Sequence, residues 1–208
     1  PLPRQVLSAP GGQRWQPDVP NWCWSEYGAR VGFWRMKRIL DEFNIKATLC
    51  INGSVCEHYP QIIDAAIESD WEFMGHNIIQ KPMHLMEDER EAVFETARII
   101  KERTGKQLRG WMGPGLTQTD DTPDYLTEAG MDYTTDWVID DQPCPIETKN
   151  GTLRLSPGLC RGCVILSRSG QQLVVQLEEP HHAIGYGDTR LVRSRPRPTT
   201  TPHKSQVY

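Results

Sequence analysis

The sequence lacks any long hydrophobic run. No apolar stretch approaches the ~20 residues that are needed to cross a bilayer, and no charged segment followed by an apolar one marks a secretory leader. We therefore expect no membrane partner and a cytoplasmic location. The chain begins with Pro1 and not with Met, so we also expect that its true start lies upstream.

An excess of positive charge is lacking as well. The formal net charge is −4, and it divides unevenly along the chain. Residues 1–149 hold 15 Lys/Arg and 24 Asp/Glu, whereas residues 150–208 hold 8 and 3, so the two parts carry −9 and +5. Because an acidic body disfavours contact with a phosphate backbone, we expect no nucleic-acid partner.

The six cysteines do not have the spacing of a small disulfide scaffold. Cys50 falls in an apolar strand, where a buried free thiol is the usual case. Cys160-Arg-Gly-Cys163 is a single C-x-x-C pair, with His181-His182 about twenty residues later. Such a pair is compatible with a zinc or redox role but is a weak signal. A reduced, cytoplasmic protein is the default interpretation.

Helical and strand patterns alternate through most of the chain. Residues 1–25 have no sustained period and are predicted to be an irregular loop in which Trp15, Trp22 and Trp24 cover the core. From residue 26 onward, apolar spacing and Gly/Pro breakers predict helices and strands in strict alternation. The predicted helices are 26–44, one that begins at Pro60 and includes Ile67, 87–103 and 122–130, and the predicted strands are 46–51, 71–74, 107–112 and 131–138.

This order of elements predicts a parallel sheet with right-handed crossovers, in either a barrel or a doubly wound arrangement. After Gly151 the pattern fades, although 152–155, 164–166 and 173–177 could form short strands. We assign residues 1–157 to one α/β domain and leave 158–192 without a fold beyond those short strands. Residues 193–208 lack the capacity to form a core and are expected to be a disordered tail.

Three predicted strands end in polar groups followed by Gly or Pro. His76 follows the second strand, the segment from Arg109 to Gly113-Pro114 spans the third, and Asp136 with Asp140-Asp141 follows the fourth. The carboxyl ends of parallel strands meet at one edge, where ligands bind. A carboxylate can activate water, an arginine can orient it, and an imidazole can bind a metal or carry a proton. The set predicts a hydrolytic site.

Several segments together resemble the polysaccharide deacetylase (NodB-homology) superfamily, and within it the allantoinase-like branch of cyclic-amide hydrolases. The resemblance covers roughly residues 3–157, and its motifs occur in the family's order. The segments that carry it are Asp18-Val-Pro-Asn-Trp22, Glu26 to Arg35, Trp71-Glu-Phe-Met-Gly-His76, Arg109-Gly-Trp-Met-Gly-Pro-Gly115 and Asp136-Trp-Val-Ile-Asp-Asp-Gln-Pro143. It implies a distorted (β/α) barrel and hydrolysis of a non-peptide carbon–nitrogen bond.

The resemblance also implies roles for particular residues. His76 matches the first histidine of the family's metal motif, but Gln80 stands where the second would be, and a side-chain amide is a poor substitute for imidazole on zinc. We therefore expect no tightly bound metal, with His76 the only ligand if zinc binds at all. The catalytic residues expected are His76, Arg109, Asp140 and Asp141. The substrate-binding residues expected are Trp22, Glu26, Trp111, Gly113, Pro114, Asp136 and Trp137.

Two departures from the family stand out. The acidic first motif, which supplies the catalytic base, would lie upstream of Pro1, so we expect an incomplete barrel without its first strand. Its last motif, Leu-x-x-His, has no clean counterpart, because Leu177 precedes His181 and His182 at a different spacing. A missing strand would expose an edge and so favour pairing with another copy.

Three functions remain open from the sequence. The first is hydrolysis of a small cyclic amide or ureide such as allantoin without a tightly held metal. The second is metal-dependent N-deacetylation of an acetamido-sugar polymer. The third is a non-catalytic fragment or binding module.

Overall fold

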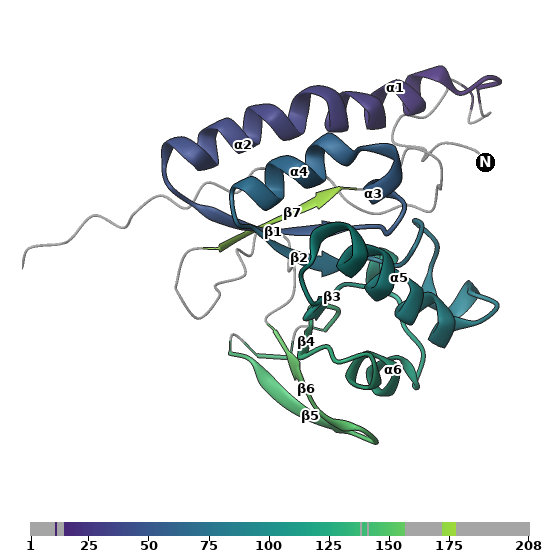
Figure 1. Ribbon diagram of the computed structural model, residues 1–208. Coiled ribbons are helices and arrows are strands. Elements are labelled where there is room, and N and C mark those ends of the chain that lie inside the picture. Colours follow the sequence, from purple (N-terminus) through teal and green to yellow (C-terminus); the bar gives the residue numbers. More distant parts are fainter. Residues whose placement is uncertain (1–10, 12–14, 138, 141, 157–171, 178–208) are drawn as a thin grey trace, which may run out of the picture.

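The computed structural model of the protein describes residues 11, 15–137, 139–140, 142–156 and 172–177. Its centre is a seven-stranded sheet with the order β5-β6-β4-β3-β2-β1-β7 (Figure 1). Neighbouring strands are parallel except for the antiparallel pair β5–β6. The strands are β1 (Lys46–Ile51), β2 (Glu72–Gly75), β3 (Gly110–Trp111), β4 (Tyr133–Thr134), β5 (Cys144–Thr148), β6 (Gly151–Leu155) and β7 (Gln172–Leu177).

Helices connect successive parallel strands, as the alternation predicted. The chain opens with α1 (Val19–Tyr27), which runs through a π-helical stretch, η2 (Gly28–Gly32), into α2 (Phe33–Glu42). The remaining helices are α3 (Val55–His58), α4 (Pro60–Glu68), α5 (Glu89–Thr104) and α6 (Thr122–Glu128), with single turns at η3 (Met83–Leu85) and η4 (Pro114–Leu116). None of the described helices is long and apolar enough to cross a membrane.

The sheet has two faces with different coverings. Side chains alternate along a strand, and Leu49, Ile51, Phe73 and Trp111 pack with the apolar residues of α2, α4, α5 and α6 in the main core. Cys50, Met74 and Met112 form a separate cluster against Tyr133. We call the first the helix-covered face and the second the inner face.

Helix α5 confirms the signals read at its ends. The side chain of Asp88 accepts a hydrogen bond from Glu91 N at 2.8 Å, which caps the first turn. Gly105 stands at the C′ position with φ of +71°, a left-handed conformation that glycine adopts without strain. Lys101 and Arg103 lie in the last turn, where positive charge complements the helix dipole.

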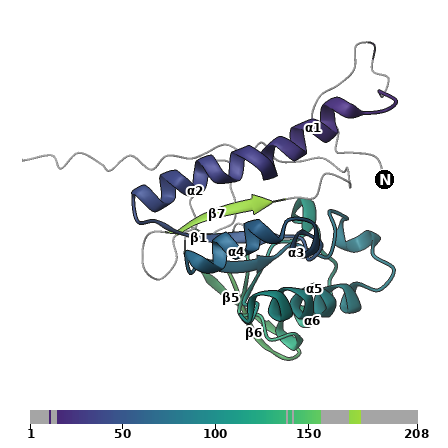
Figure 2. The ribbon, with the colours of Figure 1, turned by 45° about the horizontal axis from the view of Figure 1, so that its top comes forward.

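The expectation of an irregular loop over residues 1–25 is wrong from Val19 onward. Asp18 Oδ1 accepts a hydrogen bond from Asn21 N at 3.3 Å, and Pro20 occupies the first turn, where its missing N–H is harmless. Trp22 and Trp24 are 40% and 54% exposed and so do not cover the core. Figure 2 shows α1 running beyond the end of the sheet, which explains why this helix has no apolar stripe to reveal it.

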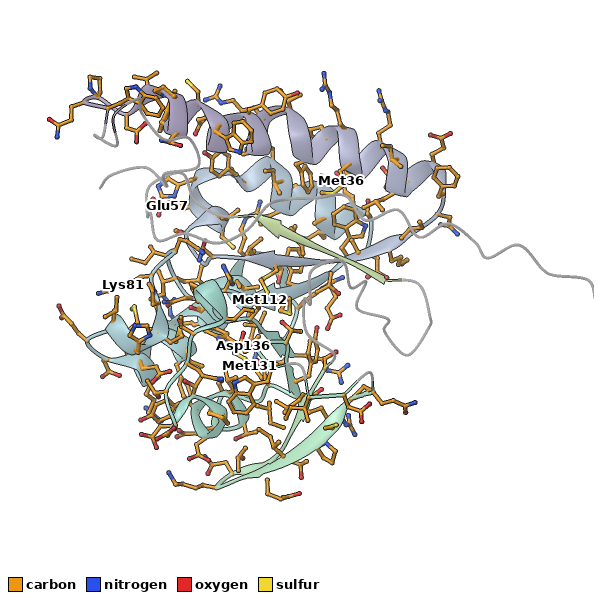
Figure 3. The ribbon with its side chains drawn as sticks, turned by 180° about the vertical axis from the view of Figure 1, so that it is seen from behind. Met36, Glu57, Lys81, Met112, Met131 and Asp136 are labelled. Carbon is orange, nitrogen blue, oxygen red and sulfur yellow. The ribbon has the colours of Figure 1, made fainter. Side chains whose placement is uncertain are left out.

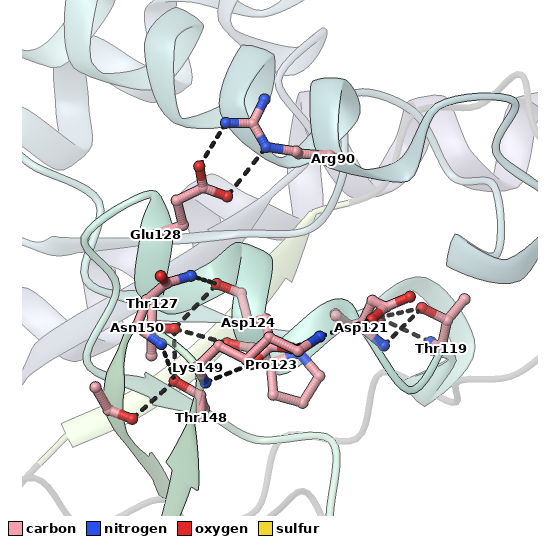
Figure 4. Close-up of polar contacts among 12 residues, drawn as sticks. Arg90, Thr119, Asp121, Pro123, Asp124, Thr127, Glu128, Thr148, Lys149 and Asn150 are labelled. Carbon is pink, nitrogen blue, oxygen red and sulfur yellow. Dashed lines mark hydrogen bonds and ion pairs between the residues drawn. The ribbon is translucent and has the colours of Figure 1, made fainter.

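The hairpin β5–β6 was predicted only in its second strand. It is held to α6 by polar contacts, and Lys149 makes most of them (Figure 4). Its ammonium lies 2.7 Å from Asp124 Oδ2 and 3.3 Å from Asp121 Oδ1, and its N–H donates to Asp124 Oδ1 at 2.7 Å. Strand β5 has an alternating partly exposed pattern and contains Pro145, features of an edge strand that gives a weak sequence signal.

The sheet ends in β7 on one side and in β5 on the other, and the edge of β1 is covered. Strand β7 pairs with it in parallel along all six residues, from Lys46 opposite Gln172 to Ile51 opposite Leu177. The short strand predicted at 173–177 is thereby confirmed as a backbone element. The short strand predicted at 164–166 and the tail at 193–208 lie outside the described residues.

Candidate functional site

The carboxyl ends of β1 to β4 bring four residues into one row. Register and continuing ladder hydrogen bonds set Asn52 beside His76, His76 beside Met112, and Met112 beside Thr135. Asn52, His76 and Thr135 each follow an inner-face residue of their own strand by two positions. Because side chains have a period of two, the row continues the inner face.

His76 is held from two sides at this edge. Its backbone N–H donates to Ile51 O at 2.9 Å, and its ring Nδ1 lies 2.6 Å from Met112 O. A carbonyl oxygen can only accept, so Nδ1 carries the proton, and Nε2 is the nitrogen with the lone pair in the neutral ring. The residue is 1% exposed, so the ring is fixed in orientation within the protein.

Asp136 is the acidic group of this region. Its Oδ1 accepts a hydrogen bond from Gly113 N at 2.7 Å, while Oδ2 is buried without a hydrogen-bond partner. Burial raises the pKa of Asp136 to about 7, and the hydrogen bonds from Gly113 and Thr134 offset only part of that effect. Asp136 can therefore both take and return a proton near neutral pH.

The turn after β3 fits Asp136 closely. A Cβ at Gly113 would stand 2.2 Å from Thr117 O and 3.3 Å from Asp136 Oδ2, so only glycine is accommodated there. Pro114 next to it is buried and opens η4. In Figure 3, Met112 and Asp136 lie close together in the middle of the molecule, away from α1 and α2.

The loop after β2 brings a buried amide to the same end of the sheet. Asn77 adopts a left-handed conformation with φ of +64°. Its Oδ1 accepts from Ile78 N at 2.7 Å, and its Nδ2 donates to Lys81 O at 2.9 Å. Gln80 inside this loop is 5% exposed, and its Oε1 has no hydrogen-bond partner.

Buried polar atoms without partners are concentrated at this end of the sheet. Most buried polar groups in proteins are hydrogen-bonded, so each exception calls for an explanation. All five such atoms found among the described residues belong to residues that end or follow β1 to β4. They are Asn52 Oδ1, Gln80 Oε1, Trp111 Nε1, Thr135 Oγ1 and Asp136 Oδ2. Four of the five are oxygens, which makes the region rich in hydrogen-bond acceptors.

Arg109 is not brought to this group, contrary to the expectation that it would join the other strand ends. It precedes β3, three residues before Met112, so it lies roughly 10 Å further down the sheet. Its guanidinium is 62% exposed and pairs with Asp132 at the amino end of β4, which raises the pKa of Arg109. The sequence had placed Arg109 inside a longer strand, whereas the strand comprises only Gly110–Trp111.

The other predicted residues are spread over several parts of the molecule. Asp140 is exposed, and its Oδ1 accepts from Gln142 N at 3.1 Å, while Asp141 lies outside the described residues. Trp137 is partly exposed beside Asp136. Glu26 accepts hydrogen bonds from Tyr59 and Arg30 on the helical layer. Trp111 is fully buried on the helix-covered face, and Trp22 projects from α1.

Sequence reasoning missed Asn52 and Thr135. Asn52-Gly53 was interpreted only as the breaker after the first strand, and Thr135 as part of a longer strand. The same strand-end rule that singled out His76 applies to Asn52, which also stands one residue beyond its strand. Thr135 follows β4 in the same way and directly precedes Asp136.

The residues described do not fit a zinc ion. Within the described ranges, no group of three or more His, Cys, Asp or Glu side chains could hold a metal. The side chains nearest His76 in the row are an amide, a thioether and a hydroxyl, and Gln80 supplies another amide. Zinc prefers imidazole, thiolate and carboxylate ligands, so this donor set does not match it.

Known structures share this fold. A probable polysaccharide deacetylase from Pseudomonas aeruginosa PAO1 aligns with a TM-score of 0.65 and 22% sequence identity, over 85% of this chain and 69% of its own length. A putative polysaccharide deacetylase from Mycobacterium smegmatis aligns with a TM-score of 0.62 and 20% sequence identity, over 73% of this chain and 64% of its own length. Puue allantoinase aligns with a TM-score of 0.58 and 23% sequence identity, over 84% of this chain and 52% of its own length. The chain thus spans less than two thirds of the last two proteins.

The sequence comparisons differ in outcome. No curated protein matches the chain. The profile of the polysaccharide deacetylase family matches residues 26–134, more than half of the 208 residues. This range contains His76 and Gly113 and ends directly before Thr135 and Asp136. The chain therefore belongs to the polysaccharide deacetylase family.

Proposed function

We propose that this member of a hydrolase family cleaves the carbon–nitrogen bond of a small cyclic amide or ureide without a tightly bound metal. The observation that carries the proposal is Asp136, a buried carboxyl whose pKa is raised to about 7 at the edge where His76 lies. Groups with perturbed pKa values concentrate at functional sites. The allantoinase fold neighbour supports a cyclic ureide as the substrate class.

Asp136 performs both proton transfers in this mechanism. Its carboxylate takes a proton from water as the water oxygen bonds to the amide carbon. The resulting acid then returns that proton to the departing nitrogen as the carbon–nitrogen bond breaks. A pKa near the working pH suits one group to both steps. The products of a cyclic amide are an open-chain carboxylic acid and an amine or urea nitrogen on the same molecule.

His76 has a positioning part in this scheme. Because its Nδ1–H is directed to Met112 O, the imidazole ring is held in one orientation at the edge where Asp136 lies. The hydrogen bond from Gly113 N to Asp136 Oδ1 leaves Oδ2 as the oxygen that exchanges the proton. Metal-dependent deacetylation of a sugar polymer is less well supported, since the described residues do not form a zinc site.

The test is turnover by the purified 208-residue chain with a small panel: allantoin, succinimide and an N-acetylglucosamine oligomer. We expect hydrolysis of a cyclic substrate that survives a chelator and falls by at least about 100-fold in Asp136→Asn. Asp132→Asn is the matched control, because Asp132 is half-exposed at the opposite end of β4 and should leave turnover unchanged.

Three outcomes would contradict the proposal. Turnover of only the sugar oligomer, abolished by chelator and restored by zinc, would assign the metal-dependent reaction. An equal loss of turnover in Asp136→Asn and Asp132→Asn would show that Asp136 has no specific role in the reaction. A folded sample with no turnover of any substrate would identify a non-catalytic binding module.

A further inference from the structure

Asn52 and Thr135 share four properties that the mechanism above does not use. Both lie in the inner-face row with His76, both are fully buried, both follow the end of a strand, and each has a side-chain oxygen without a partner. Leaving a buried polar atom without a hydrogen bond costs about 1–3 kcal/mol. Two such atoms in one row of a folded protein suggest that something outside the chain supplies the missing hydrogen bonds.

Other buried threonines provide the comparison. Thr96 donates its hydroxyl proton to Ala92 O at 2.7 Å, and the hydroxyl of Thr122 donates to Glu89 Oε1. Thr48 donates to Glu72 Oε2 at 3.0 Å. Thr135 differs from these three in having no partner for its hydroxyl oxygen. A buried threonine hydroxyl is therefore normally satisfied in this protein, and Thr135 is an exception.

The direction of the Asn52 amide is fixed by its own contact. Its Nδ2 donates to the backbone oxygen of His76. Because a carbonyl oxygen accepts only, nitrogen must face His76, and Oδ1 is left as an acceptor. The Thr135 hydroxyl can also accept. The two residues stand on either side of His76, Asn52 one strand away and Thr135 two strands away, with roughly 4.8 Å between neighbouring strands.

We infer that Asn52 and Thr135 are specificity-determining residues that accept hydrogen bonds from N–H groups flanking the scissile amide of the substrate. The inference rests on the proposed function and narrows its substrate to compact rings that carry free N–H groups. Both residues are fully buried, which suits a small ring and not a polymer strand. A site with buried acceptors strongly rejects an analogue that lacks the matching donor.

The experiment compares hydantoin with its 1-methyl and 3-methyl derivatives, in which one N–H at a time is replaced. Calorimetry gives Kd for each ring with the Asp136→Asn protein, so binding is read without turnover. We expect methylation of at least one nitrogen to raise Kd by about tenfold. We expect Thr135→Val to raise the Kd of hydantoin by about fivefold and to remove the preference against the corresponding methyl derivative.

Thr96→Val is the matched control, because it makes the same change at an equally buried threonine whose hydroxyl has a partner. We expect Thr96→Val to lower Tm and leave Kd unchanged. Thr135→Val should raise Tm or leave it unchanged, since it removes an unsatisfied buried hydroxyl. A fall in Tm for Thr135→Val with Kd unchanged would overturn the inference and assign the hydroxyl a structural role.

The readouts separate this inference from the proposed reaction. Discrimination between hydantoin and its methyl derivatives by Asp136→Asn, together with no turnover of hydantoin by the wild-type chain, would contradict the proposed function and support the recognition by Asn52 and Thr135. Turnover with equal Kd for all three rings would support the reaction and overturn the recognition. Absence of hydantoin binding by the folded protein would overturn the inference.

Discussion

The two ends of the parallel sheet are both polar, but they treat their polar groups differently. At the amino end, Arg109 pairs with Asp132, and Lys46 and Lys106 both pair with Asp70. At the carboxyl end, five buried polar atoms of the described residues lack partners, and the pKa of Asp136 is raised. Paired charges are compatible with a stable fold, whereas a buried polar atom without a hydrogen-bond partner costs stability and is usually explained by function. The contrast supports the proposal that the functional site lies at the carboxyl end.

The inner face repeats this contrast on a smaller scale. Near the amino end, Glu72 accepts hydrogen bonds from Thr48 and from the Tyr133 hydroxyl, each at 3.0 Å. Burial, together with Glu72, raises the pKa of Tyr133 and keeps the phenol protonated as a donor. Further along the same strands, Asn52 lies four residues beyond Thr48 and Thr135 two beyond Tyr133, and each has a side-chain oxygen without a hydrogen-bond partner. Hydrogen bonding on this face is thus complete near the amino end and incomplete at the carboxyl end.

The largest expected effect is the pH dependence of stability caused by Asp136. Its pKa rises from 3.8 to about 7 on folding, so between these values the folded state holds a proton that the unfolded state has lost. The free energy of unfolding should therefore fall as pH rises from about 4 to 7, by up to roughly 4 kcal/mol from this group, and level off above.

Urea unfolding of wild type and Asp136→Asn across this pH range measures the effect. The wild-type profile should fall relative to the variant as pH increases, because the amide does not titrate. Profiles that run parallel would show that the Asp136 carboxyl is not held neutral in the folded protein.

A smaller effect is expected from Gly113→Ala. The added Cβ would meet the backbone oxygen of Thr117, which cannot move aside as a side-chain tip could. We expect a loss of about 1–3 kcal/mol in the free energy of unfolding, together with a fall in turnover through displacement of Asp136. Gly28→Ala serves as the control, since a Cβ there meets no atom within 4 Å. Equal stability of the two variants would refute the close fit at Gly113.

The smallest effect belongs to the amino end. Arg109→Met removes an ion pair whose side chains are 62% and 40% exposed. Such pairs contribute about 0–1 kcal/mol and are screened by salt. We expect a change within that range at low salt, a smaller one at high salt, and no change in kcat or KM. A loss of kcat in Arg109→Met would show that Arg109 takes part in catalysis and would contradict the functional difference between the two ends of the sheet.

The sequence predicted the elements that pack against the core and missed those that do not. Helix α4 and helix α5 have apolar faces and recognisable ends, so periodicity and capping located both. Helix α1 extends past the sheet with exposed tryptophans, and β5 is a partly exposed edge strand, so neither produces the pattern that burial imposes. The two-residue strands β3 and β4 were predicted too long at both ends.

The position of a site residue could be predicted only as accurately as the end of the strand that carries it. The rule that chemistry gathers at the carboxyl ends placed His76, Gly113 and Asp136 at the edge where the structure has them. It misplaced Arg109 because a strand boundary error of three residues moves a side chain from one end of a short strand to the other. That Thr135 lacks a partner depends on side-chain contacts between strands, which no single sequence contains.

The pairing of β7 with β1 has a consequence for how the chain acquires its fold. Residues 46–51 find their neighbour β2 within about 25 positions, but their other neighbour lies more than 120 positions away. During synthesis from the amino terminus, the edge of β1 that β7 covers therefore has no partner among the described residues until residue 177 has emerged. That interval is the period in which another nascent chain could add its own strand at the same edge.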